Sequence, residues 1–165
     1  MRDERYMQIA LQLAREAFCA GEIPVGAVVV FAEEVIAQAA NEKEKRQDAT
    51  AHAEMLALQR AAEYLGGWRL AGATLYCTLE PCPMCAGAMV NSRLSRLVFG
   101  CYDDKAGSAG SILDIVRHPG LNHQLKVTPG VLEAECSELL SGFFEQMRRD
   151  GRVGRRRSTR NRVGG

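Results

Sequence analysis

The feature that most constrains this chain is a set of metal-binding residue types in two short, well-separated segments. The first segment is HAE at 52–54 and the second is PCPMC at 81–85. Residues three apart on a helix lie on the same side, so Cys82 and Cys85 can reach one ion if a helix begins there. Helix N-termini carry partial positive charge, which favours the thiolate form that metal binding requires. The fold must therefore bring two helix beginnings together.

The ligand number of this site favours catalysis. Three protein ligands, which we predict to be His52, Cys82 and Cys85 on one Zn²⁺ per subunit, leave the fourth tetrahedral position open to water. Zinc lowers the pKa of bound water to about 7. Attack on an aromatic ring carbon also needs a proton carried to a ring nitrogen and then to the leaving amine. Glu54 follows a ligand by two positions and is the predicted shuttle, so the pattern indicates a zinc-dependent hydrolytic deaminase.

A structural or redox role for the cysteine pair is the alternative. A lone C-x-x-C is a weak signal, and a structural zinc site would need a fourth ligand. His118, His123 and the other cysteines are candidates, but the chain has no second C-x-x-C and no H-x₃-H spacing. The combination of H-A-E with a downstream P-C-x-x-C is far more specific than either half.

Periodicity and turn residues predict helices alternating with strands. We expect an amphipathic helix over 2–20, and a second helix capped by Thr50 and ended by Gly66–Gly67. Further helices are expected from Pro83 onward and from about Leu132 to Arg149. The expected strands are 25–31, 35–40, 73–78, 94–102 and a short one within 125–132, with a polar loop at 41–48. This alternation predicts an α/β fold with a layered sheet covered on both faces.

Length and charge divide the chain into a domain and a tail. With 165 residues, one domain over 1–150 is expected, followed by a basic tail over 151–165 with too little apolar content to pack. The segment from Arg148 to Gly165 contains eight arginines and one acidic residue, Asp150. The other 147 residues carry 13 basic and 19 acidic side chains. A basic tail on an acidic body suggests an anionic partner, most simply nucleic acid, or else a solvated tail that aids solubility.

Cysteine usage and hydropathy favour a cytoplasmic protein. No stretch approaches the ~20 apolar residues that span a bilayer, so no membrane partner is expected. The polar N-terminal residues do not resemble a signal peptide. Of the six cysteines, four lie singly in apolar surroundings and are expected to be buried small hydrophobes: Cys19, Cys77, Cys101 and Cys136.

Several stretches resemble the bacterial tRNA-specific adenosine deaminases (the TadA family), of the cytidine deaminase-like superfamily. The resemblance covers about 6–149. The TLEPCPMCAGAM stretch is shared across purine and cytosine deaminases, whereas DDKAGSAGS, HPGLNH and the last helix narrow it to the tRNA enzymes. The resemblance implies a three-layer α/β/α sandwich with a central mixed sheet of about five strands. It also implies a homodimer that converts adenosine to inosine at the wobble position (34) of a tRNA anticodon stem-loop, typically in an arginine tRNA. DNA is not expected as the natural substrate.

The resemblance also assigns roles by position. It matches His52, Cys82 and Cys85 to the zinc ligands, Glu54 to the proton shuttle and Asn41 to the residue that hydrogen-bonds the flipped-out nucleotide. Asp103 matches a loop aspartate near the nucleotide backbone, for which a ribose hydroxyl or a structural loop bond is the expected partner.

Further RNA contacts are hypotheses with ordinary structural alternatives. Lys105 could neutralise a phosphate, and the backbone N–H of Ala51 could orient the base or the attacking hydroxide. Phe144, at the edge of the apolar stripe of the last helix, could face a base or pack in the core. Arg148 could hold a phosphate, or simply suit a helix C-terminus.

One departure and two rival functions remain open. Ala49 stands where the family often has proline, which would loosen the turn before His52. A deaminase of free bases or nucleosides, of the guanine or cytosine type, would share every zinc residue and lack the RNA contacts. A non-catalytic zinc-binding RNA adaptor would have no use for Glu54.

Overall fold

The computed structural model describes residues 1–151, and within them a five-stranded mixed sheet lies between two layers of helices. The β-branched and apolar runs become the strands β1 (Gly26–Phe31), β2 (Glu34–Ala40), β3 (Thr74–Leu79), β4 (Arg96–Cys101) and β5 (Lys126–Thr128). The helices are α1 (Arg2–Cys19), α2 (Lys43–Arg46), α3 (Ala53–Leu65), α4 (Pro83–Asn91) and α5 (Glu133–Arg149).

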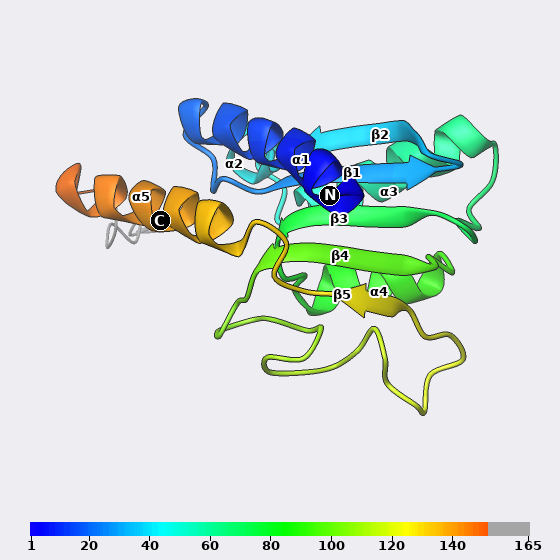
Figure 1. The fold of residues 1–165 in the computed structure, drawn as a ribbon. Coiled ribbons are helices and arrows are strands. Elements are labelled where there is room, and N and C mark those ends of the chain that lie inside the picture. Colours follow the sequence, from blue (N-terminus) through cyan, green and yellow to red (C-terminus); the bar gives the residue numbers. More distant parts are fainter. Residues whose placement is uncertain (152–165) are drawn as a thin grey trace, which may run out of the picture.

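The strand order is β2-β1-β3-β4-β5, which makes the sheet mixed. β1 is antiparallel to both β2 and β3, and β3, β4 and β5 run parallel to one another. The carboxyl ends of β2, β3 and β4 therefore meet the beginning of β1 at one edge of the sheet. The connections after β2 and β3 lead into α3 and α4, so both of these helices begin at that same edge (Figure 1).

Alternation along the strands divides the core in two. Ala27 and Val29 of β1 pack with α3 and α4, whereas Val28 and Val30 face α1. Figure 1 shows α1 and α5 on one face of the sheet and α3 and α4 on the other. The predicted α/β/α sandwich is confirmed, because side chains that alternate along each strand fill both layers.

Close packing of α1 on β1 depends on a glycine. A Cβ atom on Gly26 would lie 1.9 Å from the carbonyl oxygen of Ala10. Any side chain at this position would push the helix off the sheet, because protein interiors leave no such space. The close approach fixes the start of β1 at the edge of the sheet where α3 and α4 begin.

Two details of the predicted elements are wrong. The predicted loop at 41–48 contains the one-turn helix α2, and α3 begins at Ala53 with His52 rather than Thr50 as the capping position. The Thr50 N–H and hydroxyl both donate to Asp48 Oδ1, at 2.8 and 2.7 Å. The hydroxyl is therefore engaged in the turn rather than at the helix terminus. The Asp48 carboxylate therefore braces the turn that contains Ala49.

The cysteine prediction holds for three of four positions. Cys77, Cys101 and Cys136 are buried, but Cys19 is exposed. Cys19 ends α1 outside the face that contains the buried residues Ala10, Ala14 and Ala17. The predicted tail lies outside the described residues beyond Gly151. No helix within residues 1–151 is long and apolar enough to cross a membrane.

An ion pair fastens α1 to the sheet. The Asp3 carboxylate accepts hydrogen bonds from the Arg96 guanidinium at 2.9 and 2.7 Å and from the Tyr76 hydroxyl at 2.8 Å. The hydrogen bonds from Arg96 hold the pKa of Asp3 below its ordinary value, against the opposing effect of burial. The stability that Asp3 contributes is therefore present above its unfolded-state pKa of about 3.9 and is lost as the pH falls through the folded-state value.

Replacing Asp3 with asparagine is expected to lower the free energy of unfolding by about 1–2 kcal/mol at pH 7. The difference from the unmodified protein should begin to shrink as the pH falls below ~4, because the unfolded-state carboxyl is then protonated, and it should disappear once the pH lies below the lower folded-state pKa of Asp3. Urea unfolding at pH 7 and at lower pH measures both. Glu4→Gln, at an exposed neighbouring position, is the matched control. A difference independent of pH would contradict the argument.

Candidate metal centre and active site

The candidate site lies at the edge where β1 begins and β2, β3 and β4 end. A cavity of about 210 Å³ opens there. Its lining comes from the start of β1, the ends of β2 and β3, the beginnings of α2, α3 and α4, and the segment after β4: Ile23, Val25, Asn41, Lys43, His52, Ala53, Glu54, Leu79, Glu80, Cys82, Asp103 and Ala106. Ligands of open α/β sheets typically bind at such an edge, where loops from several strands converge.

The three predicted metal ligands converge at this edge. His52 precedes α3 in extended conformation, Cys82 caps α4, and Cys85 lies in the first turn of α4. His52 Nδ1 is 3.5 Å from the Sγ of both cysteines, and the three ligand atoms all lie within 4.8 Å of one another. Pro83 at the first helical position needs no hydrogen-bond acceptor for its nitrogen, so α4 can begin directly after the first cysteine.

These distances fit a tetrahedral zinc ion. Zinc bonds of ~2.3 Å to sulfur and ~2.0–2.1 Å to nitrogen, at a tetrahedral angle, place the two ligand atoms about 3.5 Å apart. His123 Nε2 instead hydrogen-bonds the Leu94 carbonyl at 2.7 Å, and His118 accepts the Gly120 N–H. Among residues 1–151 the group therefore has three members, which is the ligand number of a catalytic zinc site.

The surroundings of Cys82 favour its thiolate form. Hydrogen bonding from Cys85, aided by His52, lowers the pKa of Cys82 to about 4, against the effect of burial. Cys82 is therefore a thiolate at neutral pH. The hydrogen bond to Cys82 raises the pKa of His52. A half-buried thiolate at a helix N-terminus supplies the soft, negative ligand that zinc prefers.

Glu54 lies beside the ligands in the first turn of α3. It is 4% exposed, and its Oε2 is 3.3 Å from the Cys85 Sγ. Burial raises the pKa of Glu54. A carboxyl group that faces a cavity and has a raised pKa can hold a proton between two transfers, as general acid–base chemistry requires.

Comparisons with known proteins agree with this geometry. The MafB19-like deaminase family matches residues 1–148. The tRNA-specific adenosine deaminase of Bacillus subtilis (strain 168) is 48% identical over 155 residues, which cover 94% of this chain and 96% of that protein. This chain belongs to the tRNA-specific adenosine deaminases. Two solved structures show which kind of deaminase this fold resembles more.

The first solved structure comes from studies of A-to-I editing by tRNA:A34 deaminases at the wobble position of transfer RNA. It superposes with a TM-score of 0.80 at 42% identity and covers 82% of this chain and 99% of that chain. The second, a guanine deaminase from Nitrosomonas europaea, gives a TM-score of 0.73 at 28% identity, with 85% and 83% covered. The predicted cytidine deaminase-like fold is therefore confirmed, and the tRNA enzyme is the nearer of these two.

Asn41 of this deaminase lines the cavity, 7% exposed, at the end of β2. Its Nδ2 donates to the Ile23 carbonyl at 3.2 Å, and its Oδ1 accepts the Lys43 N–H at 3.1 Å. An amide side chain has two N–H donors and two lone pairs, so one of each remains to meet a ligand. Ala51 is buried beside His52 but does not line the cavity, and its N–H donates to the Asp48 carbonyl at 3.2 Å. Its predicted substrate contact therefore gains no support from this placement.

The loop after β4 carries two predicted RNA contacts. Asp103 lines the cavity, and its Oδ1 accepts the N–H groups of Lys105 and Ala106 at 3.0 and 3.2 Å. One carboxylate oxygen therefore makes the structural loop bond that the sequence allowed, and Oδ2 has no protein partner among the described residues. Lys105 is exposed and outside the cavity lining. Its predicted contact with phosphate stays a prediction.

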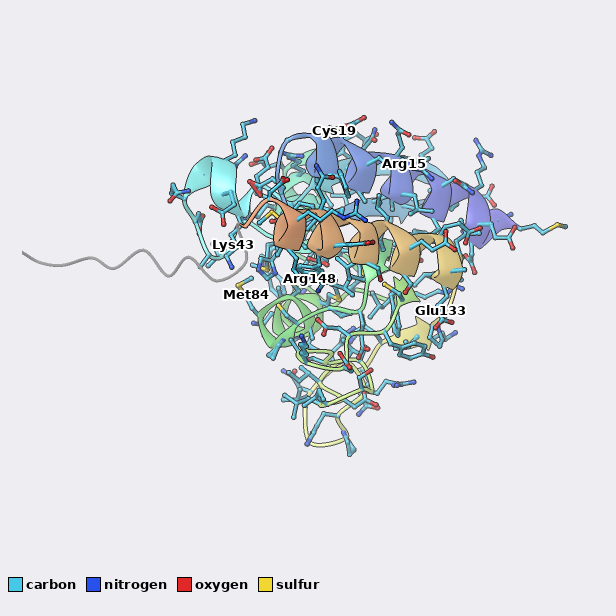
Figure 2. The ribbon with its side chains drawn as sticks, turned by 90° about the vertical axis from the view of Figure 1, so that its left-hand side faces the viewer. Arg15, Cys19, Lys43, Met84, Glu133 and Arg148 are labelled. Carbon is cyan, nitrogen blue, oxygen red and sulfur yellow. The ribbon has the colours of Figure 1, made fainter. Side chains whose placement is uncertain are left out.

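The two predicted contacts on α5 lie outside the cavity. Phe144 is 39% exposed and packs edge-on against Phe143, with ring centroids 5.6 Å apart. Arg148 is exposed in the last turn of α5, and Figure 2 shows it on the same side of the molecule as Lys43 and Met84. Both can meet only parts of a substrate that extend beyond the cavity.

Sequence reasoning missed two polar residues of the lining, Lys43 and Glu80. Lys43 follows Asn41 by two positions in a segment that reads as an ordinary polar loop, so local sequence carried little signal. Glu80 ends an apolar strand directly before the metal-binding motif, and an acidic residue there was a signal that could have been used. It is 1% exposed.

Proposed function

We propose that this chain deaminates adenosine to inosine at the wobble position (34) of a tRNA anticodon stem-loop, in an arginine tRNA. The observation that carries the proposal is the convergence of His52, Cys82 and Cys85 beside the buried Glu54, in a chain that belongs to the tRNA-specific adenosine deaminases. An anticodon loop already presents unstacked bases, so extruding one adenosine costs less than it would in a duplex. A cytoplasmic location is part of the proposal, because the tRNA substrate is found there.

The cavity suits a single base. Its volume of about 210 Å³ lies below the ~300–1,000 Å³ of pockets that enclose drug-sized ligands. Ile23 and Val25 provide an apolar wall for the ring, and the remaining amide groups of Asn41 can pair with its polar edge. The ribose and flanking phosphates would then lie at the rim, near Lys43 and Asp103.

His52, Cys82 and Cys85 would hold Zn²⁺, which when bound lowers the pKa of water to about 7. Glu54 takes the proton from the attacking water and delivers it to ring N1, as the water oxygen bonds to C6. Glu54 then takes the second proton of the former water and gives it to the amine. The C6–N bond breaks, and inosine and ammonia leave. The low exposure of Glu54 excludes bulk water from these transfers.

Contacts at the rim of the cavity and outside it would recognise the RNA. Lys43 and Arg148 are exposed cations on one side of the molecule, and each can neutralise a phosphate (Figure 2). Phe144 offers an exposed aromatic face for a base. These contacts distinguish the proposal from a deaminase of free bases, which would have no use for them.

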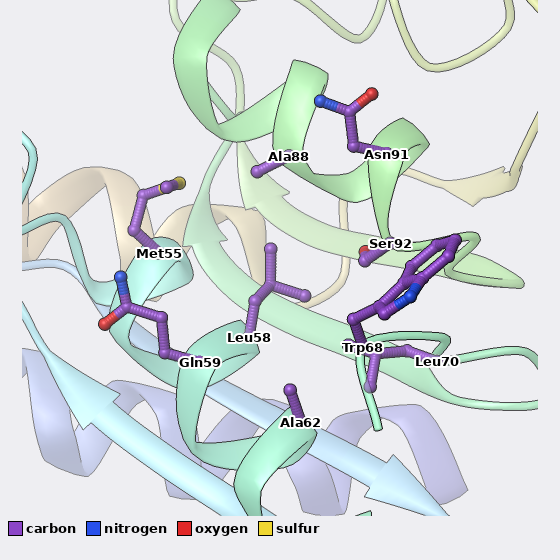
Figure 3. A pocket seen from close by; sticks show the side chains of 9 residues that line it. All are labelled: Met55, Leu58, Gln59, Ala62, Trp68, Leu70, Ala88, Asn91 and Ser92. Carbon is purple, nitrogen blue, oxygen red and sulfur yellow. The ribbon is translucent and has the colours of Figure 1, made fainter. Parts of the chain in front are cut away.

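A homodimer is part of this proposal, and an apolar groove between α3 and α4 supports it. The groove has a volume of about 320 Å³ and is lined mostly by apolar side chains (Figure 3). Trp68 is 55% exposed at its edge, with the Arg69 guanidinium 4.6 Å from the ring centroid. A second copy of this face would bury the groove, and large exposed aromatic side chains are typical anchors of such interfaces.

Replacing Trp68 with glutamate is expected to weaken the dimer by on the order of 100-fold, because it would bury a charge where an aromatic anchor stood. Sedimentation velocity over a concentration series measures the shift. Tyr64→Glu, at an exposed aromatic position on α3 outside the groove lining, is the matched control. A dimer unaffected by Trp68→Glu would place the interface elsewhere.

The deciding experiment incubates the zinc-loaded protein with an arginine tRNA transcript that carries adenosine at position 34. Free adenosine, cytidine and guanine are tested beside it. Inosine at that position alone, with the small molecules unchanged, supports the proposal. Turnover of a free base or nucleoside with unchanged tRNA would instead favour the free-base deaminase. Zinc binding without any turnover would favour the non-catalytic adaptor.

A further inference from the structure

Glu80 is a buried acidic residue that the chemistry above does not use. It is 1% exposed and lies between the end of β3 and the ligand Cys82, outside the three-residue metal group. A buried carboxylate is costly unless hydrogen bonds compensate it, so its partners indicate its role.

All side-chain hydrogen bonds of Glu80 go to the loop that follows β4. Oε1 accepts the Asp103 N–H at 3.1 Å and the Ser111 hydroxyl at 2.5 Å. Oε2 accepts the N–H groups of Ala109 and Ser111, both at 3.1 Å. One side chain therefore ties both ends of the 103–111 loop to the segment that carries the metal-binding cysteines.

The loop wraps the carboxylate so closely that only glycine fits at position 107. A Cβ atom there would lie 2.5 Å from the Glu80 carboxyl group and 2.3 Å from the Asp103 carbonyl oxygen. The adjacent Ser108 N–H donates to the Pro81 carbonyl at 2.8 Å, which adds a second attachment. The conformation that places Asp103 and Ala106 in the cavity lining is thus the one built around Glu80.

We propose that Glu80 is a positioning residue for RNA binding: its carboxylate holds the 103–111 loop so that Asp103 and Ala106 form the rim of the cavity. The inference rests on the proposed function, because it takes the RNA as the ligand of that rim. It assigns Glu80 no contact with the metal and no proton transfer.

A carboxylate is needed here because all four partners are donors. Glutamine has nearly the same shape, but one of its two terminal atoms is an NH₂ group that cannot accept a hydrogen bond. With its NH₂ group in the place of Oε2, Glu80→Gln loses the hydrogen bonds from the Ala109 and Ser111 N–H groups. With the NH₂ group in the place of Oε1, it loses the hydrogen bond from the Asp103 N–H, and the Ser111 hydroxyl must turn to accept. The loop should therefore lose its fixed conformation, whereas the apolar core below it stays unchanged.

The test compares Glu80→Gln with the unmodified protein on a tRNA anticodon stem-loop bearing adenosine at position 34. The expected result is a KM about 10-fold higher, with kcat within about two-fold and one zinc per chain retained. Glu138→Gln, an exposed position on α5, is the matched control and should leave KM and kcat unchanged. A lowered kcat at unchanged KM, or a loss of zinc, would overturn the proposal.

A double-mutant cycle separates positioning from general destabilisation. In an Asp103→Ala background, Glu80→Gln should raise KM by less than about two-fold further, because the contact that it positions is already gone. Fully additive effects would show that Glu80 does not act through this loop. If Glu80→Gln fails to fold, Ser111→Ala removes one donor only and should raise KM about three-fold; an unchanged KM would overturn the proposal. Failure of the unmodified protein to deaminate the stem-loop would instead reject the proposed function.

Discussion

Replacing Glu54 with glutamine is expected to lower kcat on the tRNA stem-loop by about 10³–10⁴-fold while zinc stays bound. Glutamine has the shape of glutamate but cannot take a proton from water and return it to the base. The substitution leaves the three metal ligands unchanged, because Glu54 is not one of them. Steady-state rates of inosine formation, together with zinc content by atomic absorption, measure the two effects separately.

The matched control for this substitution lies on the same helix. Glu63→Gln changes an exposed carboxyl group near the end of α3 and should keep both kcat and zinc content. Because Glu54 is buried, a thermal unfolding curve should accompany the kinetics to show that the variant is folded. A folded, zinc-loaded Glu54→Gln enzyme with more than about a tenth of normal turnover would eliminate Glu54 as the proton shuttle.

The metal site could be predicted from the sequence because its information is local. His52 and Glu54 are separated by one residue and Cys82 and Cys85 by two, and each pair lies at a helix beginning. Helical spacing fixes how such neighbours are arranged, whatever the rest of the chain does. The strands could also be predicted from the sequence, since their β-branched runs and bounding turns are local signals.

The features that the sequence did not reveal depend on distant partners. α2 consists of charged residues without an apolar face, and it is fastened by the buried Glu22, whose carboxylate accepts the N–H groups of Glu44 and Lys45 at 3.1 and 2.6 Å. Nothing in the local pattern links these positions. The role of Glu80 likewise appears only when the loop after β4 is folded over it.

Thr50 shows a third kind of failure. A threonine before an alanine-rich helix is a common capping residue. Here Asp48 lies two positions earlier and takes both the N–H and the hydroxyl of Thr50, so the turn and the helix terminus compete for the same group. Local competition of this kind cannot be resolved by propensity, because either arrangement satisfies the hydroxyl.

Removing zinc is expected to lower the unfolding temperature by about 10 °C and to abolish turnover. A metal that binds only the folded state stabilises it by about 4 kcal/mol when present at ~1,000 times its Kd. In a chain of this length, 1 kcal/mol shifts the unfolding temperature by about 2–4 °C. The site joins the beginnings of α3 and α4, so its loss should loosen the layer that contains Glu54. Calorimetry before and after chelation, followed by zinc restoration, measures the effect.

Cys82→Ser should reproduce the effect of chelation without any chelator. Serine replaces the thiolate by a hydroxyl group that zinc binds poorly, so zinc content should fall below about a tenth of an ion per chain and turnover by at least ~10³-fold. Cys19→Ser is the matched control, because Cys19 is an exposed thiol at the end of α1, away from the metal group. A Cys82→Ser protein with normal zinc content would require another ligand and would refute the three-residue site. Normal turnover without zinc would instead refute the metal-dependent chemistry.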